Sequence, residues 1–273
     1  MSTIFDKFSL KGKIAIVTGG PGLLGAEFCR TLAEAGAKVV VADLDGKAAE
    51  AVALKLREHN FPAIAAPVDV TRPDQVKAMV DNVINEFGRI DVLVNSAAID
   101  PKFDPSHPGT DNGAFETYPV ELWRKAIDVN LTGAFLCSQA VAGPMLKNGG
   151  GSIINICSTY GLVGPDQRIY EKEGAPVRYK PVYYSVTKAG ILGLTRYLST
   201  YFAGKGIRAN ALTPGGIFNN NDDEFLKNYS ARAVMGRMAH KDEMNGAILF
   251  LASEASSYMT GSNLVVDGGW TAW

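Results

Sequence analysis

Short apolar runs of strand length alternate with helical patterns along the whole chain. The runs, rich in Val and Ile, lie at 13–17, 38–42, 63–68, 90–94, 152–156, 207–212 and 263–266. They lack the polar alternation of half-exposed strands, so we expect strands buried on both faces of a parallel sheet. Repeated strand–helix units predict an α/β fold with a doubly wound, Rossmann-type sheet in three α/β/α layers. No linker divides the chain, and we expect one domain over 1–273.

Helical patterns fill the intervals between these runs. They lie at 22–35, 46–59, 73–87, 120–146, 183–202 and 244–253. Asp45 is placed to cap the second of these helices, and Thr71 to open the third. The irregular segments at about 100–118, 161–181 and 215–238 leave from the carboxyl ends of strands. Because open α/β sheets bind ligands at that edge, we expect these segments to be substrate loops.

A glycine-rich turn joins the first strand to the first helix, in the order Thr18-Gly19-Gly20-Pro21-Gly22-Leu23-Leu24-Gly25. Glycine permits a tight turn and the close approach of a pyrophosphate, and the following helix N-terminus offers free N–H donors. We predict that a dinucleotide contacts Gly19, Gly22, Leu23 and Leu24 here. An ordinary strand–helix turn is the alternative.

An acidic residue ends the second strand. Asp43 follows Gly19 by 24 residues, and a carboxylate there can accept hydrogen bonds from a ribose. The same charge repels a 2′-phosphate, and no Arg or Lys in the glycine turn offsets it. NAD is therefore favoured over NADP. The alternative is that Asp43 only begins a turn, which would leave the choice of cofactor open.

Tyr184 and Lys188 lie four residues apart at the start of a helical pattern, which puts them on one helix face. A phenol with a pKa near ~10 is a poor base at neutral pH. An ammonium one turn away favours the phenolate and prepares the group for proton transfer. Together with the glycine turn and Asp43, this pair indicates a hydride-transfer site rather than a solvated helix face.

With these features in order, the chain resembles the short single-domain branch of the short-chain dehydrogenase/reductase family. The matching positions are 18–25, Asp43, Asp69-Val70, Asn95-Ser96-Ala97-Ala98, Asn130, Ser158, Tyr184, Lys188, Pro214-Gly215 and 265–269. The resemblance implies that Tyr184 is the general acid/base, and that Lys188 lowers its pKa and holds the nicotinamide ribose. It implies that Ser158 donates a hydrogen bond to the substrate oxygen and that Asn130 supports a water in a proton relay.

The resemblance also implies the remaining contacts of the two ligands. Besides the residues already named, we expect cofactor contacts at Leu44, Asp69, Val70, Asn95, Ala97, Tyr184, Lys188, Pro214, Gly215, Ile217 and Asn219. We expect substrate contacts at Ser158, Tyr184, Tyr160 and Arg168. One position departs from the family, because Leu23 stands where the short branch usually has the middle glycine of the turn.

The segment between Ser158 and Tyr184 is much longer than is usual in the family, with 26 residues separating the two. It is rich in charged side chains and must pass near the substrate, because both of its ends are catalytic. A polar wall suits a sugar, a sugar acid or a polyol, and Arg168 could bind a carboxylate, sulfonate or phosphate. A solvated loop is the alternative. Phe103 and His107 could reach the site from the segment 100–118.

Composition excludes several other classes of protein. The formal net charge is −1 with no basic block, so we expect neither nucleic acid nor membrane as a partner. Three cysteines without a Cys-x-x-Cys pair indicate free thiols, and three dispersed histidines indicate that no metal is bound. The N-terminus lacks the order of a signal peptide, and we expect a cytoplasmic enzyme.

The sequence thus predicts an NAD-dependent enzyme that interconverts a secondary alcohol and a ketone on a small polar substrate. By resemblance, helices 120–146 and 183–202 would form the contacts of a homo-oligomer, a tetramer or a dimer, and the aromatic C-terminus 270–273 would add to them. Two alternatives stay open. One is an epimerase or dehydratase on nucleotide-linked sugars that retains its NAD, and the other is a non-catalytic NAD-binding regulator.

Overall fold

The computed structural model describes residues 3–100, 113–172 and 174–273. Its centre is one sheet of seven parallel strands in the order β3-β2-β1-β4-β5-β6-β7. The strands are β1 (Ile14–Thr18), β2 (Lys38–Asp43), β3 (Ala63–Pro67), β4 (Val92–Asn95), β5 (Gly151–Ile156), β6 (Ile207–Pro214) and β7 (Asn263–Val266). The predicted doubly wound parallel sheet is confirmed.

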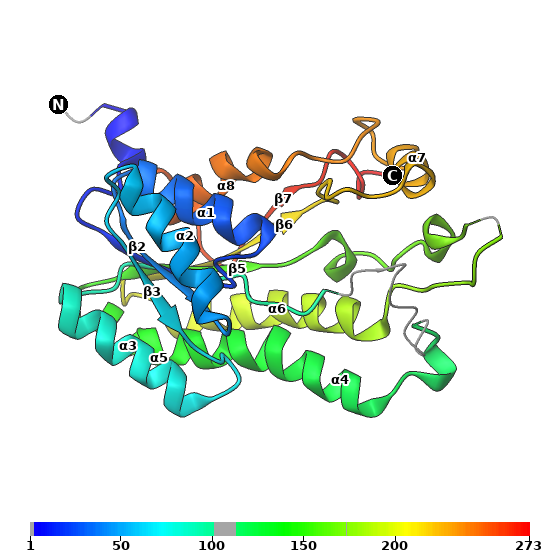
Figure 1. Cartoon of the computed structure of the whole chain (residues 1–273). Helices are drawn as coiled ribbons and strands as arrows, with labels where there is room; N and C mark the ends of the chain where they lie inside the picture. The colour runs from blue at the N-terminus through cyan, green and yellow to red at the C-terminus, as the bar shows by residue number, and fades with distance from the viewer. Residues whose placement is uncertain (1–2, 101–112, 173) are drawn as a thin grey trace.

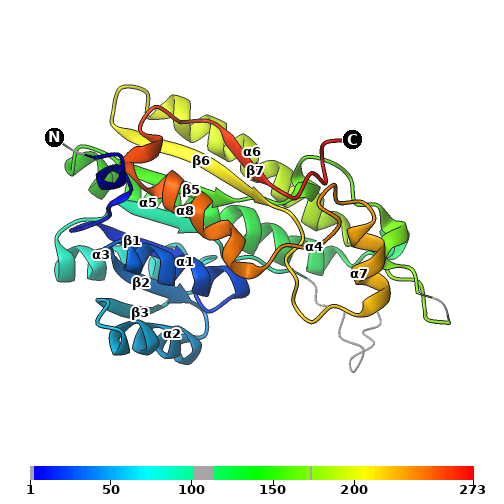
Figure 2. The same cartoon turned by 90° about the horizontal axis from the view of Figure 1, so that it is seen from above.

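Helices cover both faces of this sheet (Figure 1). One layer contains α1 (Leu23–Glu34), α2 (Gly46–Glu58) and α8 (Asn245–Ala252), and the other contains α3 (Pro73–Phe87), α4 (Val120–Ile127), α5 (Gly133–Lys147) and α6 (Val182–Tyr201). A further helix, α7 (Asp223–Ser230), lies beside the C-terminus, away from both layers (Figures 1 and 2). Short 3-10 turns lie at Phe5–Phe8, Phe115–Thr117, Thr159–Gly161, Gln167–Tyr170, Lys241–Met244 and Glu254–Ser256.

The pleat of the strands divides the apolar core between the two layers. In β1, Ala15 and Val17 join the core beneath α1, α2 and α8, while Ile14 and Ile16 join the core beneath α3, α5 and α6. Successive side chains of a strand point to opposite faces, so a strand covered on both sides must be apolar at every position. All five residues of β1 are buried, which explains the uninterrupted apolar run in its sequence.

Ligands of such folds bind where the strand order reverses. Here β1 lies between β2 and β4, so the connections after β1 and β4 diverge to opposite faces of the sheet. Thr18 holds this point together, because its hydroxyl donates to the Val94 carbonyl and accepts from the amides of Ser96 and Ala97. The glycine turn and the end of β4 are therefore fixed against each other.

Of three local expectations, two are confirmed and one is wrong. The predicted helix 120–146 is present as α4 and α5, which a π-helical turn at Asp128–Thr132 joins. Thr71 does not cap α3, because its hydroxyl donates to Asp69 and the N-cap residue is Arg72. Asp45 does cap α2, accepting from the amides of Lys47 and Ala48.

A stretch of apolar helix that could span a bilayer is not found within the described ranges.

Candidate active site

Two glycines of the turn, Gly19 and Gly25, leave no room for a side chain. Gly19 has a φ of +67°, and a Cβ placed on it would lie 2.8 Å from the Cα of Ala97. A Cβ on Gly25 would lie 2.1 Å from the carbonyl oxygen of Gly19. Gly22 is the N-cap residue of α1 and has no side chain to cap the helix, and the first turn of α1 has no acidic residue. A helix start of this kind has unused N–H donors and a positive dipole, and both fit a pyrophosphate.

Adding one methyl group at Gly25 is expected to damage this turn. Gly25→Ala should lower the free energy of unfolding by about 1–3 kcal/mol, because the added carbon forces the backbone to move. Gly246→Ala is the matched control, since the space around a Cβ at Gly246 in α8 is open. Alanine there should be neutral or stabilise by ~0.5–1 kcal/mol. Denaturant unfolding measures both, and equal stability of the two variants would contradict the steric argument.

The residues predicted to hold the adenosine lie at the carboxyl ends of β2 and β3. Asp43 ends β2, and its Oδ1 accepts from the amide of Asp45 at 2.8 Å. Leu44 follows with an exposed fraction of 75%, which leaves an apolar surface next to that carboxylate. Asp69 accepts from the amide and the hydroxyl of Thr71, and these hydrogen bonds lower the pKa of its carboxyl. Val70 is buried against Gly133, where a Cβ would lie 2.7 Å from its Cγ2.

The side chain of Asn95, another predicted cofactor residue, belongs to a buried hydrogen-bond network. Its Nδ2 donates to Asn155 Oδ1 at 2.8 Å and to Ser138 Oγ at 3.0 Å, and Asn155 in turn donates to Thr195. This buried network joins β4 and β5 to α5 and α6. Sequence reasoning missed it, because its members are far apart along the chain.

The predicted acid/base pair lies at the start of α6, beside the end of β5. Lys188 is buried, and its Nζ donates to the carbonyl of Ile156, the last residue of β5, at 2.9 Å. The Nζ atom is 5.7 Å from the centroid of the Tyr184 ring. Ser158 lies two residues beyond β5 and is hydrogen-bonded through its side chain to Tyr184. The structure therefore brings Ser158, Tyr184 and Lys188 together. The spacing predicted the proximity of Tyr184 and Lys188, and the family resemblance implied that of Ser158.

Burial governs the protonation of this group. The pKa of Tyr184 is raised well above its ordinary value, chiefly because burial disfavours the phenolate and further because of the charge of Asp100. The hydrogen bond from Ser158 acts in the opposite direction. Burial also lowers the pKa of the Lys188 ammonium. The expected lowering of the Tyr184 pKa by Lys188 is therefore not the net effect in the structure.

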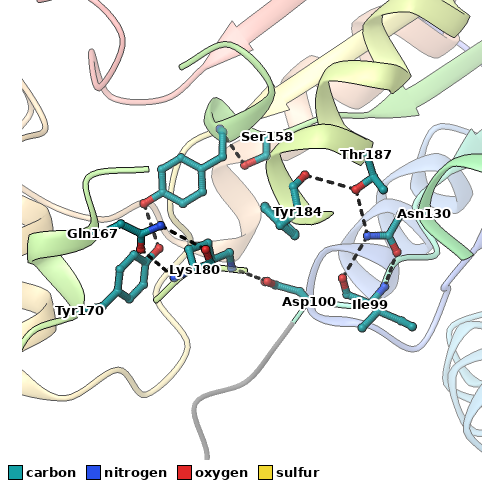
Figure 3. Close-up of polar contacts among 10 residues, drawn as sticks. Ile99, Asp100, Asn130, Ser158, Gln167, Tyr170, Lys180, Tyr184 and Thr187 are labelled. Carbon is teal, nitrogen blue, oxygen red and sulfur yellow. Dashed lines mark hydrogen bonds and ion pairs between the residues drawn. The ribbon is translucent and has the colours of Figure 1, made fainter. Parts of the chain in front are cut away.

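Asn130 lies in the π-helical turn and is 2% exposed. Its Oδ1 accepts from the amide of Ile99 at 2.7 Å, and its Nδ2 donates to the carbonyl of Ile99 and to the hydroxyl of Thr187 (Figure 3). Thr187 precedes Lys188 on α6, so Asn130 ties the segment after β4 to the helix that carries Tyr184 and Lys188. The π turn and these contacts explain why an Asn lies in the middle of a helical pattern.

The long segment before Tyr184 is anchored to the site by aromatic side chains. The Tyr170 hydroxyl donates to the Tyr160 hydroxyl at 2.9 Å, and Tyr160 packs edge-on against Tyr184 with ring centroids 6.4 Å apart. Tyr160 also packs edge-on against the buried Trp270, which stacks on Tyr229 of α7. Trp270 is thus covered within its own chain.

Arg168, the predicted anion ligand, is engaged within the loop. Its Nε and Nη2 donate to the two oxygens of Asp166 at 2.7 and 2.8 Å, and its side chain is 77% exposed. Asp166 also pairs with Arg232 at 2.6 Å, and these partners lower the pKa of its carboxyl to about 2. An anion at Arg168 would have to compete with Asp166.

A different cation of the same segment, Lys180, lies beside Tyr184, the predicted acid/base. Lys180 Nζ is 4.1 Å from the centroid of the Tyr184 ring and 2.5 Å from Asp100 Oδ1. The sequence carried a signal for it, since Lys180 and Lys188 each lie four residues from Tyr184. Lys180 precedes α6, however, so helical spacing does not place it.

The connection after β6 completes the edge of the site. Gly215 follows Pro214, and a Cβ on it would lie 2.8 Å from the Cα of Asp267, so the chain passes close to the end of β7. Ile217 forms an isolated bridge with Ala239. The amide of Asn219 donates to Asn221. An open cavity of about 670 Å³ adjoins this connection, lined by Glu27, Arg30, Phe218, Asn219, Asn220, His240, Lys241 and Asp242.

Phe103 and His107, which the sequence suggested as a second wall, lie outside the described residues. Among the residues that are described, no three His, Cys, Asp or Glu side chains gather where they could hold a metal ion. All three cysteines are buried free thiols.

Comparison with known proteins agrees with this fold. A family model described as enoyl-(acyl carrier protein) reductase matches residues 23–271. A cis-4-hydroxycyclohexanecarboxylate dehydrogenase of Sinomonas cyclohexanicum is 36% identical over 264 residues, covering 95% of this chain and 97% of the relative. The chain belongs to the short-chain dehydrogenase/reductase family.

Relatives at similar distance differ in the substrates that their names state. A 3-alpha-(or 20-beta)-hydroxysteroid dehydrogenase of Mycobacterium tuberculosis is 36% identical, with 96% of this chain and 91% of the relative covered. The crystal structure of a gluconate 5-dehydrogenase from Burkholderia cenocepacia with NADP and tartrate has a TM-score of 0.86 and 34% identity, and covers 99% of this chain and 100% of its own. These relatives are all named as dehydrogenases of alcohols, but their names do not point to one substrate or one cofactor for this chain.

Proposed function

We propose that this protein is an NAD-dependent oxidoreductase that interconverts a secondary alcohol and a ketone on a sugar, a sugar acid or a polyol. The observation that carries the proposal is the group Ser158, Tyr184 and Lys188 at the carboxyl end of β5, on the same edge of the sheet as the glycine turn. The relatives support the reaction class, since those compared above are named as dehydrogenases of hydroxyl compounds.

Each residue of this group has a definite task. Tyr184 exchanges a proton with the substrate oxygen, and Ser158 donates a hydrogen bond to that oxygen, where charge develops during the reaction. Lys188 holds positive charge behind the phenol, and Asn130 fixes the helix that carries both. The nicotinamide cofactor supplies the hydride acceptor when it is bound. The glycine turn would hold its pyrophosphate and Asp43 its adenosine ribose.

The polar walls of the site support the substrate class. The segment 159–181 brings charged groups to the phenols, since the pKa of Tyr160 is raised chiefly by burial and further by the charge of Asp166, and Lys180 Nζ lies 4.1 Å from the centroid of the Tyr184 ring. Covering these charges with an apolar steroid would cost more than covering them with a polar substrate. A panel of sugars, sugar acids and polyols assayed with NAD and NADP, read as NADH or NADPH absorbance, tests the proposal. Turnover of apolar alcohols only, or no turnover with any member of the panel, would contradict it.

The raised pKa of Tyr184 predicts opposite pH dependences for the two directions. Oxidation needs the phenolate, so kcat/KM for the alcohol should rise with pH from 7 to 10, by up to about tenfold per unit while the pH is below the pKa. Reduction needs the phenol, which is fully present over that range, so its kcat/KM should not rise. Initial rates in both directions across this range check the sign, and an oxidation rate independent of pH would contradict it.

We also propose that the protein is a cytoplasmic homo-oligomer, a tetramer or a dimer. Large apolar side chains are exposed on α4 and α6, within the two helical regions expected to form the subunit contacts. They are Val120, Leu122, Val186, Tyr197 and Tyr201. Exposed apolar side chains on neighbouring helices are typical of a subunit contact. Sedimentation of the purified protein would show a monomer if the proposal is wrong.

A further inference from the structure

Lys180 is nearly buried and yet lies at the catalytic phenol. Its side chain is 10% exposed, and its Nζ lies 4.1 Å from the centroid of the Tyr184 ring. An ammonium with so little solvent around it requires an anionic or strongly polar partner. In the structure that partner is Asp100, at 2.5 Å (Figure 3).

The backbone of Lys180 is held in place by a single side chain. The Gln167 amide contacts it twice, with Oε1 accepting from Lys180 N at 2.8 Å and Nε2 donating to Lys180 O at 3.2 Å. Gln167 belongs to the turn Gln167–Tyr170, which Tyr170 anchors to Tyr160. The long segment thus folds back on itself and delivers Lys180 to the site, while Pro181 starts α6 directly after it.

The partner of Lys180 is replaceable, whereas Lys180 itself is fixed. Asp100 has a side chain that is 57% exposed, so solutes can reach the ion pair from the side of Asp100. Another carboxylate could take the place of Asp100 without leaving the nearly buried ammonium unpaired. Lys188 lies on the same ring at 5.7 Å, so two cations surround the reacting phenol and favour a negatively charged substrate.

We propose that Lys180 binds the carboxylate of a sugar-acid substrate, which displaces Asp100 from the Lys180 ammonium while the reacting hydroxyl of the substrate meets Tyr184 and Ser158. This inference rests on the proposed function and narrows its substrate class from polar alcohols to hydroxy acids. It assigns the role of anion ligand to Lys180 in place of Arg168, whose guanidinium is taken by Asp166.

The test compares each acid with its own neutral amide. Aldonic and uronic acids and their carboxamides are assayed with NAD and the full chain, and kcat and KM are determined separately for the best pair. Lys180→Met should raise KM for the acid by about 30-fold or more, the lower range for removing one partner of a desolvated charge pair. For the amide the change should stay below about threefold, and Lys180→Arg should recover most of the affinity for the acid.

Asp100→Asn gives a result that a merely structural ion pair would not. Removing the competing carboxylate should lower KM for the acid several-fold and leave KM for the amide unchanged. Lys172→Met is the control, because Lys172 lies on the same segment but pairs with Asp222 at 2.7 Å. Lys172→Met should change KM for the acid and KM for the amide by the same factor. A loss in Lys180→Met that is equal for acid and amide, or a higher KM for the acid in Asp100→Asn, would overturn the proposal.

Failure of this inference is distinguishable from failure of the proposed function. Wild-type protein that oxidises neutral polyols or amides but none of the acids would overturn the role of Lys180 and leave the dehydrogenase activity intact. Calorimetric titration of gluconate into the NADH-loaded protein gives a readout without turnover, because NADH cannot accept a hydride from the alcohol. Gluconate that binds to wild type but not to Lys180→Met, with no oxidation of any alcohol, would support the carboxylate site and contradict the dehydrogenase.

Discussion

Tyr184→Phe is expected to lower kcat by about 10³-fold, within the range of roughly 10²–10⁴ for losing a positioned acid/base. The variant lacks only the hydroxyl that exchanges the proton with the substrate oxygen. Its ring keeps the edge-on contact with Tyr160 and the cation contact with Lys180, so the fold and the binding of NAD should be unchanged. Steady-state rates measure the loss of turnover, and quenching of protein fluorescence by NAD measures the cofactor affinity.

The neighbouring phenol supplies the control. Tyr183 is buried and packs against Tyr118 with ring centroids 5.9 Å apart, and it is one residue out of register with Lys188. Tyr183→Phe should change kcat by less than about tenfold, because its hydroxyl is not the one bonded to Ser158. Turnover in Tyr184→Phe above a tenth of the wild-type value would remove Tyr184 from the acid/base role. Biological activity that stays intact in Tyr184→Phe after turnover is lost would instead favour the non-catalytic regulator.

The sheet was predictable because its determinants are local. A strand covered on both faces is apolar throughout, and β1, β2 and β4 show this in their sequences. The cap at Asp45 was predictable for the same reason, since it contacts amides only two and three residues away. The break at Asp128–Thr132 was not, because the apolar pattern continues through it and Asn130 finds its partner Ile99 31 residues away.

The same distinction between local and long-range contacts explains which residues of the candidate site were predicted. Tyr184 and Lys188 are on one continuous helix, so their spacing predicted their proximity. Lys180 was missed because its position depends on Gln167, 13 residues away, and on Asp100, 80 residues away. Arg168 was predicted to bind an anion, but Asp166, two residues before it, already accepts its hydrogen bonds. In this loop, charge alone did not reveal which cation lies beside Tyr184.

Asp43 is expected to decide between NAD and NADP. Like charges about 4 Å apart repel by roughly 1–4 kcal/mol, depending on the local dielectric. Asp43→Ala should therefore reduce the ratio of kcat/KM for NAD to that for NADP by about 10- to 100-fold. The outcome is informative, because the related gluconate 5-dehydrogenase was crystallised with NADP. Initial rates with each cofactor at a saturating alcohol concentration give the ratio.

Two further variants separate charge from hydrogen bonding and from helix stability. Asp43→Asn keeps an oxygen that can accept from Asp45 N and from a ribose hydroxyl, but it removes the charge. Asp43→Asn should raise kcat/KM for NADP, as Asp43→Ala does, but it should lose less affinity for NAD than Asp43→Ala. Asp45→Ala removes the cap of α2, at a cost of about 1 kcal/mol in stability, and should leave the cofactor ratio unchanged. If the ratio stays constant in both Asp43 variants, this carboxylate only begins the turn into α2 and another part of the site selects the cofactor.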